Sequence, residues 1–375
     1  MTVQSGSFGV QEDEFFYRAS EFARHHGLPR VFLSCNSGAR IGLVEELKPK
    51  FQVAWKDEAV PAMGFEYLYL TEEDFKALPP GTVLAEPRKL PNGEIRYALD
   101  AIIGTANGIG VENLRGSGLI AGETSRAYDE TFTLSYVTGR SVGIGAYLNR
   151  LGQRVIQMQQ GPMILTGYQA LNKLLGKEVY TSLDQLGGPQ IMYPNGVTHE
   201  VVSNDKEGMQ AVVDWLSYTP KDFTSTAPVV SYGDSPERSI DFLPTKTAYD
   251  PRHMLAGTTA PDGSFISGFF DKDSFKEYLG GWGKSVVAGR ARLGGMPVGV
   301  IAVETRLMEQ RIPADPGNPE SREAIQPQAG QVWYPDSAYK TAQAIQVINN
   351  KYQYHVMANY NYYENTVHHI FVLGL

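Results

Sequence analysis

The sequence predicts an α/β fold built from repeated strand–turn–helix units. Two strand-like runs, 30–34 and 131–137, each end in a glycine-bearing turn that leads into a helical pattern. A third apolar run, 154–158, is followed by further helical periodicity. The chain also has 39 glycines among 375 residues, and several of them cluster at strand ends, as tight strand-to-helix turns require. Alternation of this kind is typical of α/β topology.

Composition limits the class of protein. The length of 375 residues predicts two domains or three, and 42% hydrophobic with 20% charged residues describes a soluble globular protein. The net charge of −8 argues against nucleic-acid binding, which needs a basic face. Because no run of about 18 apolar residues and no leader pattern occurs, we expect no membrane span. The single cysteine, Cys35, excludes intrachain disulfides; we expect a buried structural thiol in a reducing compartment.

The first elements follow from periodicity. Residues Glu12–His26 have an apolar helical face, and Arg30–Ser34 is a buried strand. The glycine turn Asn36–Gly42 then feeds a helix, Leu43–Leu47. Residues 51–100 form an irregular insertion in which we expect two short strands, Phe65–Leu70 and Ile95–Leu99.

The turn after residue 137 is the strongest candidate for chemistry. Ser141 is a plausible helix N-cap, and Gly143 in the first helical turn would let a ligand oxygen approach its N–H closely. Arg140 stands beside it as a fixed positive charge for a phosphate or carboxylate. The alternative is an ordinary strand–turn–helix packed through glycines, with a solvated arginine.

Other familiar sites are missing or weak. The glycines of 104–118 lack the spacing of a dinucleotide or P-loop site, and no Gly-x-Ser-x-Gly elbow occurs. No cluster has metal-ligand spacing, so we expect no metal. We interpret His199 as a structural hydrogen-bonding residue. Four carboxylates could serve a hydratase as acid and base, although solvation on a helix surface is the default: Glu45, Glu46, Glu123 and Asp129.

The second half begins after an amphipathic helix, Asp205–Tyr218, and a Pro-, Ser- and Thr-rich linker, 219–244. We expect a helix over Asp273–Leu279, a hairpin closed by Gly294-Gly295 between 286–293 and 297–303, and a helix over Ser337–Ile348. The last 25 residues, 351–375, show no clear period, and we expect no folded unit there.

Long, ordered motifs between about Gly6 and Asn349 carry a resemblance. They are Asn36–Gly42, Glu112–Gly118, Thr124–Tyr128, Thr138–Tyr147, Gln185–His199, Gly289–Glu304 and Gln328–Trp333. These segments resemble the carboxyltransferase region of eukaryotic multidomain acetyl-CoA carboxylase, in the biotin-dependent acyl-CoA carboxylase family. The resemblance implies a crotonase-like (ClpP/crotonase) β-β-α superhelix in two related subdomains. Residues 1–231 would form the first subdomain without its start, 232–350 the beginning of the second, and 351–375 a divergent tail.

The family resemblance also implies an activity. A carboxyl group would pass from carboxybiotin, on a biotinyl carrier domain, to acetyl-CoA, giving malonyl-CoA for fatty acid synthesis. Decarboxylated biotin would remove the methyl proton, so no protein base is required. By position, Gly143 matches an N–H donor to the substrate oxygen, and Gly38 and Ala39 are further backbone candidates. Arg140 matches the acetyl-CoA-contacting arginine, while Tyr147 and Leu114 match pocket-lining positions.

Further expectations follow from where the resemblance stops. The family region begins before Met1, and its arginine–glycine motif has no counterpart after Asn350. We therefore expect an incomplete second subdomain, weak binding of CoA and little turnover by this fragment. We expect a homodimer through the carboxyltransferase subdomains, located in the cytoplasm or, for a plastid parent enzyme, in the plastid. Two alternatives stay open: another crotonase-type acyl-CoA enzyme (a hydratase or isomerase), or a non-catalytic dimerisation partner of the full-length carboxylase.

Overall fold

A four-stranded parallel sheet lies at the centre of the molecule. The structure, a computed structural model, describes residues 4–40, 47–103, 113–230, 234–235, 237–349, 356–358 and 370–374. The strands of the central sheet are β1 (Arg30–Ser34), β6 (Thr133–Val137), β8 (Arg154–Met158) and β10 (Glu200–Val202), in the order β1-β6-β8-β10. All neighbouring pairs are parallel. Helices therefore connect the strands, which confirms the predicted α/β topology.

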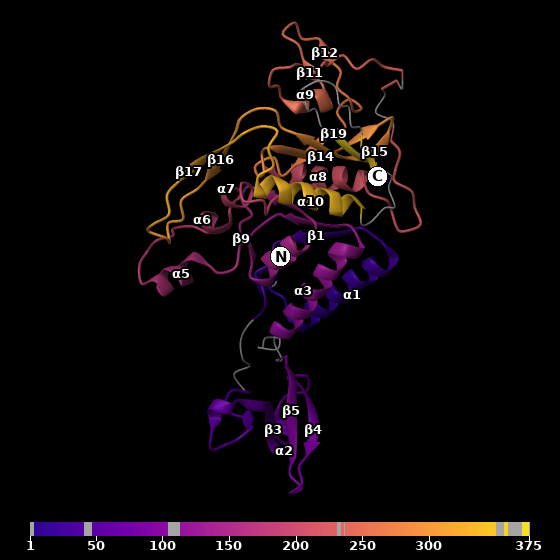
Figure 1. Ribbon diagram of the computed structural model, residues 1–375. Helices are drawn as coiled ribbons and strands as arrows, with labels where there is room; N and C mark the ends of the chain where they lie inside the picture. Colours follow the sequence, from indigo (N-terminus) through magenta and orange to yellow (C-terminus); the bar gives the residue numbers. More distant parts are fainter. Residues whose placement is uncertain are drawn as a thin grey trace.

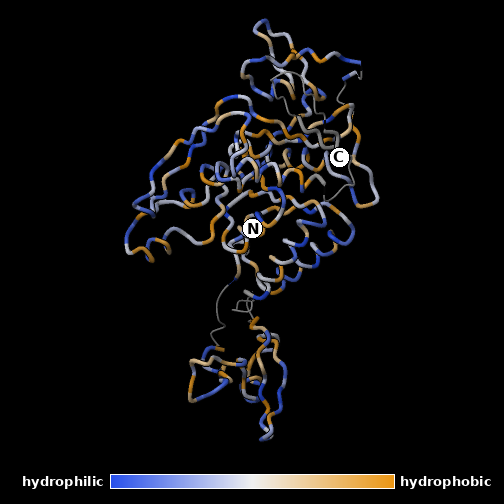
Figure 2. The backbone as a smooth tube through the Cα atoms, in the orientation of Figure 1, coloured by the Kyte–Doolittle hydropathy of each residue, from blue (hydrophilic) through white to orange (hydrophobic). Residues whose placement is uncertain are grey.

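Helices α1 (Val10–His26) and α3 (Asn113–Glu130) run side by side against this sheet (Figure 1). The Glu12 carboxylate accepts the N–H of Gly9 at the start of α1, and Gly27, with φ of 66°, ends it. Blue and orange stretches alternate along α1 (Figure 2). The predicted apolar face is not the buried one: Phe15 and Phe22 are exposed, whereas Asp13, Ser20 and Arg24 are buried. A buried ion pair of 2.9 Å between Arg24 and Glu123 joins the two helices.

Residues 47–102 form a separate small sheet that projects from the rest of the molecule (Figure 1). It contains β2 (Gln52–Trp55), β3 (Phe65–Thr71), β4 (Val83–Lys89) and β5 (Ile95–Ile102), with α2 (Glu72–Ala77). Its strands are antiparallel, in the order β2-β3-β5-β4, over a small core of Leu47, Leu70, Leu78, Val83 and Ile102. The two predicted strands are confirmed, and the two edge strands β2 and β4 were missed.

The second half of the chain contains a five-stranded antiparallel sheet. Its strands are β13 (Lys276–Tyr278), β14 (Val286–Leu293), β15 (Met296–Val303), β19 (Ile370–Gly374) and β18 (Val356–Ala358), in that order. The predicted hairpin is confirmed, since Leu293 pairs with Met296 across two glycines with φ of 59° and 81°. The expected helix over Asp273–Leu279 is wrong. Both end residues have positive φ, and residues between them pair with β14 instead.

The last 25 residues differ from the prediction as well. We expected no folded unit over 351–375, whereas β18 and β19 pair with each other and β19 pairs with β15. The run Ile370-Phe371-Val372-Leu373 has high β-propensity, and the other edge of β15 would otherwise be open.

The remaining elements are η1 (Gln4–Gly6), η2 (Pro61–Met63), β7 (Ser141–Val142), β9 (Met163–Ile164), α4 (Ile144–Leu151), α5 (Tyr168–Leu175), α6 (Asp184–Gly187), α7 (Pro189–Met192), α8 (Asp205–Ser217), α9 (Pro251–Ala256), β11 (Thr258–Thr259), β12 (Phe265–Ile266), β16 (Met308–Ile312), β17 (Ala324–Gln328) and α10 (Pro335–Asn349).

One apolar cluster joins both halves of the chain. Tyr136 and Ile156 from the central sheet, Trp215 from α8, and Tyr278 and Ile301 from the second sheet belong to it. The predicted subdomain boundary near residue 231 falls after α8, within the predicted linker. Arg292 connects this linker to its surroundings. Its buried guanidinium donates to the carbonyls of Pro228 in the linker, Ser217 at the end of α8 and Gly295 in the hairpin. Within the described ranges, no helix is both long and apolar enough to cross a membrane.

Candidate functional site

Two turns meet where β1 and β6 end. These strands are parallel neighbours, with Ser34 opposite Val137, so both turns emerge at the same edge of the sheet. The turn after β1 contains Asn36, whose carbonyl accepts the N–H of Val142 over 2.7 Å. The hydroxyls of Ser34 and Ser141 lie 2.7 Å apart in a buried hydrogen bond. The structure therefore brings together the two glycine turns that follow the predicted strands 30–34 and 131–137.

Helix α4 starts from the second turn, but not at the predicted N-cap. Ser141 lies in the short strand β7, which pairs with β9, and its N–H donates to Pro162. The N-cap is Gly143, with φ of 55° and ψ of −123°, a conformation that favours glycine. The expectation for Ser141 was wrong because a neighbouring strand holds its backbone extended.

The backbone donors of α4 also differ from the expectation. The N–H of Gly143, predicted to bind a substrate oxygen, donates to the carbonyl of Ile164 over 2.9 Å. This N–H is therefore occupied in the structure. The first-turn N–H groups of Ile144 and Gly145 have no intrahelical acceptor, and the positive end of the helix dipole lies there. The electropositive group is the start of α4 rather than Gly143 alone.

The turn after β1 supplies one further donor, the N–H of Ala39. The N–H of Gly38 is already used, because it donates to the side chain of Asn36 over 2.6 Å. Ala39 forms a parallel bridge with Phe8, whose hydrogen bonds use the carbonyl of Gly38 and the N–H of Arg40. The N–H of Ala39 takes no part in the hydrogen bonds of this bridge. Of the two candidates in this turn, Ala39 thus fits a donor role better.

The predicted substrate contacts surround these turns. Arg140 is exposed, and its guanidinium donates to the Ser37 hydroxyl over 3.2 Å, across the gap between the two turns. Tyr147 projects from α4 with 52% of its surface exposed. Leu114 belongs to the first turn of α3, which packs beside α4, but its side chain lies outside the described residues. The arrangement leaves Arg140 and Tyr147 accessible to a ligand.

The structure accounts for the groups weighed against this site. His199 is buried, and its Nδ1 accepts the N–H of Val155; burial and Arg154 hold its pKa well below the usual value, as a structural histidine requires. Glu123 is paired with Arg24, and Asp129 is exposed on α3. Glu45 and Glu46 lie outside the described residues. The described part of the chain holds no group of three His, Cys, Asp or Glu suited to a metal.

One residue near the site was missed. The carboxylate of Asp205, the first residue of α8, accepts hydrogen bonds from the hydroxyls of Tyr136 and Thr138, at the end of β6. These hydrogen bonds hold the pKa of Asp205 below its usual value. The only sequence signal was the capping pattern of Asn204 and Glu207, which marks a helix start and not this contact.

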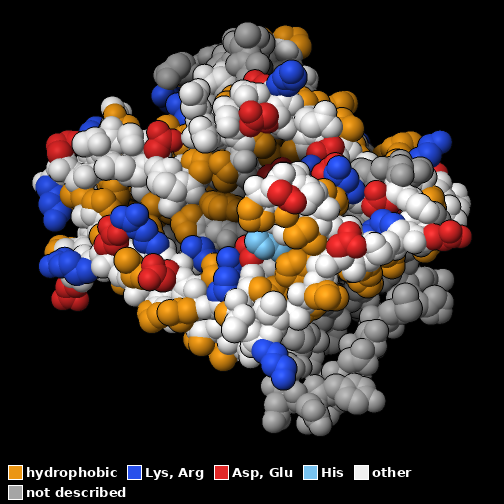
Figure 3. Space-filling view, turned by 90° about the horizontal axis from the view of Figure 1, so that it is seen from above, with side chains coloured by type: hydrophobic (Ala, Val, Ile, Leu, Met, Phe, Trp, Pro, Cys, Tyr) orange, Lys and Arg blue, Asp and Glu red, His pale blue; other side chains and the backbone are white. Residues whose placement is uncertain are grey.

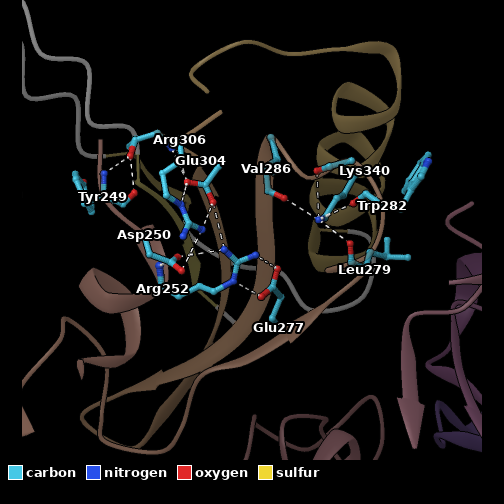
Figure 4. Close-up of polar contacts among 12 residues, drawn as sticks. Tyr249, Asp250, Arg252, Glu277, Leu279, Trp282, Val286, Glu304, Arg306 and Lys340 are labelled. Atoms are coloured by element: carbon cyan, nitrogen blue, oxygen red, sulfur yellow. Dashed lines mark hydrogen bonds and ion pairs between the residues drawn. The ribbon is translucent and has the colours of Figure 1, made fainter. Parts of the chain in front are cut away.

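A larger polar cluster in the second half is structural (Figure 4). Arg252 binds Glu277, Glu304 and Asp250, and Arg306 binds the same buried Glu304. Each of these five charged groups is paired with at least one of opposite sign, as in a structural ion-pair network. On the face seen from above in Figure 3, basic and acidic side chains lie interspersed and form no patch of one sign.

Comparison with known proteins identifies relatives of the chain. The model of the carboxyl transferase domain family matches residues 1–356. The chain is 54% identical over 362 residues to acetyl-CoA carboxylase of Saccharomyces cerevisiae, which covers 95% of this chain and 16% of that protein. It is 52% identical over 353 residues to acetyl-CoA carboxylase of Schizosaccharomyces pombe, covering 93% of this chain and 15% of that protein. The chain thus spans a small part of these relatives.

Solved structures show the same fold. Transcarboxylase 12S, determined with hydrolysed methylmalonyl-coenzyme A bound, matches 80% of this chain and 44% of its own with a TM-score of 0.53 and 18% identity. A second transcarboxylase 12S structure, with methylmalonyl-coenzyme A and methylmalonic acid, gives a TM-score of 0.54. These matches confirm the crotonase-like fold. The family match over nearly the whole chain shows more: this chain is a member of the carboxyl transferase domain family.

Proposed function

We propose that this chain is the carboxyltransferase part of an acetyl-CoA carboxylase, which transfers a carboxyl group from carboxybiotin to acetyl-CoA to give malonyl-CoA. The observation that carries this proposal is the meeting of two glycine turns at the start of α4, with an exposed arginine, Arg140, hydrogen-bonded from one turn to the other. Identity of 52–54% to acetyl-CoA carboxylases over 93–95% of the chain supports it.

The donors suit the chemistry of a thioester. Removing a proton from the acetyl methyl group places negative charge on the thioester oxygen, and preorganised N–H groups stabilise such charge. Ile144 and Gly145 at the start of α4, with Ala39 on the facing turn, supply these groups. Arg140 would bind a negatively charged part of the acyl-CoA, and exposed Tyr147 would pack against its apolar part.

The site lacks a candidate base of its own among the described residues of the two turns, 36–40 and 138–143. That fits a reaction in which bound carboxybiotin, carried on a biotinyl domain, provides both the carboxyl group and the base. The residues of this chain would then bind and orient the thioester. We further propose a homodimer through the carboxyltransferase subdomains and a cytoplasmic or plastid location, both from the family resemblance.

Binding of acetyl-CoA to the purified chain tests the proposal. Isothermal titration calorimetry should show binding to the wild type and at least tenfold weaker binding to Arg140→Ala, because one charge-assisted contact is lost. Arg126→Ala is the matched control, since Arg126 is an exposed arginine of α3 whose partner, Glu130, lies on the same helix. Absence of binding to the wild type, or equal binding to both arginine variants, would refute the proposal.

A further inference from the structure

Asn36 connects the two turns of the site. Its side chain is only 1% exposed, and its Oδ1 accepts the N–H of Gly38 over 2.6 Å within the first turn. Its backbone carbonyl accepts the N–H of Val142 over 2.7 Å from the second turn. One residue is thus hydrogen-bonded to both sides of the site.

The same side chain lies against the start of α4. A Cβ added at Gly145 would be 2.7 Å from Oδ1 and 2.9 Å from Cγ of Asn36, closer than real side chains pack. Gly145 therefore leaves the space that the carboxamide occupies. This contact sets how near the first turn of α4 can come to the turn that carries Ala39.

The carboxamide carries an unusual cost. Its Nδ2 is buried and has no hydrogen-bond partner. A buried donor without a partner destabilises the folded protein, so the geometry of the turn does not by itself account for an amide at this position. Aspartate offers the same acceptor to Gly38 and has no donor to satisfy, but its charge would be buried beside the start of α4.

We propose that Asn36 is a positioning residue that fixes the N–H of Ala39 relative to the N–H groups of Ile144 and Gly145, and so preorganises the site for the thioester oxygen. This inference rests on the proposed function. A neutral amide is required at this place because a carboxylate of the same shape would oppose the negative charge that develops on the substrate. The residue acts through the backbone donors and does not itself touch the substrate.

Asn36→Asp separates this role from a merely structural one. The variant keeps the acceptor for Gly38 and the shape of the side chain, so it should still unfold in urea in a single cooperative transition, although its buried charge lowers the midpoint. The probe is acetyl-CoA labelled with ¹³C at the carbonyl. Its infrared carbonyl band should move to lower frequency when bound to the wild type, because the donors polarise the carbonyl, and this shift should shrink by at least half in Asn36→Asp.

Two further variants complete the experiment. Asn195→Asp is the matched control, since Asn195 also accepts the N–H of the residue two positions on, Val197, but on an exposed turn outside the site. Its carbonyl shift should equal that of the wild type. Gly145→Ala displaces the carboxamide of Asn36, which is the acceptor of the Gly38 N–H, so it should reduce the shift even if Asn36→Asp fails to fold.

The outcomes distinguish the two proposals. If the wild type binds no acetyl-CoA, both fail. If the wild type binds and shows a shifted band that folded Asn36→Asp retains in full, the proposed function stands and the inference about Asn36 is overturned. If Asn36→Asp does not fold, an undiminished shift in Gly145→Ala overturns the inference in the same way.

Discussion

The phenol of Tyr136 donates a 2.7 Å hydrogen bond to Asp205, which ties the end of β6 to the first residue of α8. Asp205 also accepts from the Thr138 hydroxyl, two residues before Arg140. Gly208 makes the approach possible, because a Cβ there would lie 2.2 Å from the ring of Tyr136. The helix that covers the sheet thus also fixes the start of the turn carrying Arg140.

Replacing Asp205 by asparagine should weaken this tie. The native pKa of Asp205 is lowered, so its carboxylate contributes stability above its unfolded pKa, near 4, and loses it as pH falls through the native value. Urea unfolding at pH 7 should show a loss of up to about 1 kcal/mol, since the group is exposed. This difference should shrink as pH falls below the unfolded pKa of about 4. A pH-independent difference would show that the charge is unimportant.

Gly143→Ala should strain the start of α4. The position has φ of 55°, and the nearest atom to an added Cβ is 4.0 Å away, so the effect comes from backbone conformation rather than collision. We expect a loss of about 2 kcal/mol in unfolding free energy and weaker acetyl-CoA binding. Gly167→Ala is the control, because Gly167 caps α5 with negative φ and open space around it. Equal effects of both substitutions would contradict this account.

Local patterns predicted much of the fold. Helices α1, α8 and α10 and strands β1, β6 and β8 appear where periodicity placed them. In α1, however, Phe15 and Phe22 of the predicted apolar face are exposed, and buried Arg24 pairs with Glu123 of α3 instead. Strand β13 was misread because its apolar spacing also suits a helix. The positive φ at Asp273 and Leu279 and the pairing with β14 depend on contacts distant in sequence. Similarly, β4 carries Pro87 and charged residues on an edge, which weakens its sequence signal.

The candidate site was located from sequence but not resolved in detail. Glycines after two strands indicated the turns, and parallel pairing brought those turns together. The bond from Gly143 to Ile164 forms across 21 residues, so no local rule could show that this donor is occupied. The role of Asn36 likewise depends on its contact with Gly145, which is visible only once β1 and α4 are packed.

Lys340 should be essential for anchoring α10 to the second sheet. Its buried Nζ donates to the carbonyls of Leu279, Trp282 and Val286 over 2.7–3.1 Å (Figure 4). Lys340→Met would leave these acceptors buried and unpaired, with an expected loss of about 3 kcal/mol by urea unfolding. Lys276→Met, which removes an exposed lysine of β13, should change stability by less than about 0.5 kcal/mol. A small loss for Lys340→Met would mean that water replaces the ammonium.

Asp13 should destabilise the native state at alkaline pH. Its side chain is 2% exposed between α1 and α3, close to Gly116, and neither carboxylate oxygen has a hydrogen-bond partner. Burial, with Glu12 nearby, raises the pKa of Asp13 to about 7. The native state therefore holds a proton between pH 4 and 7 that the unfolded chain releases, and stability falls as pH rises through this window. Asp13→Asn removes the penalty, so its gain in unfolding free energy should be about 2 kcal/mol larger at pH 8 than at pH 5.

The control for Asp13→Asn is Glu14→Gln, which removes an exposed carboxylate one residue away and should show no such pH dependence. Equal gains for Asp13→Asn at both pH values would show that the carboxylate reaches solvent when it ionises.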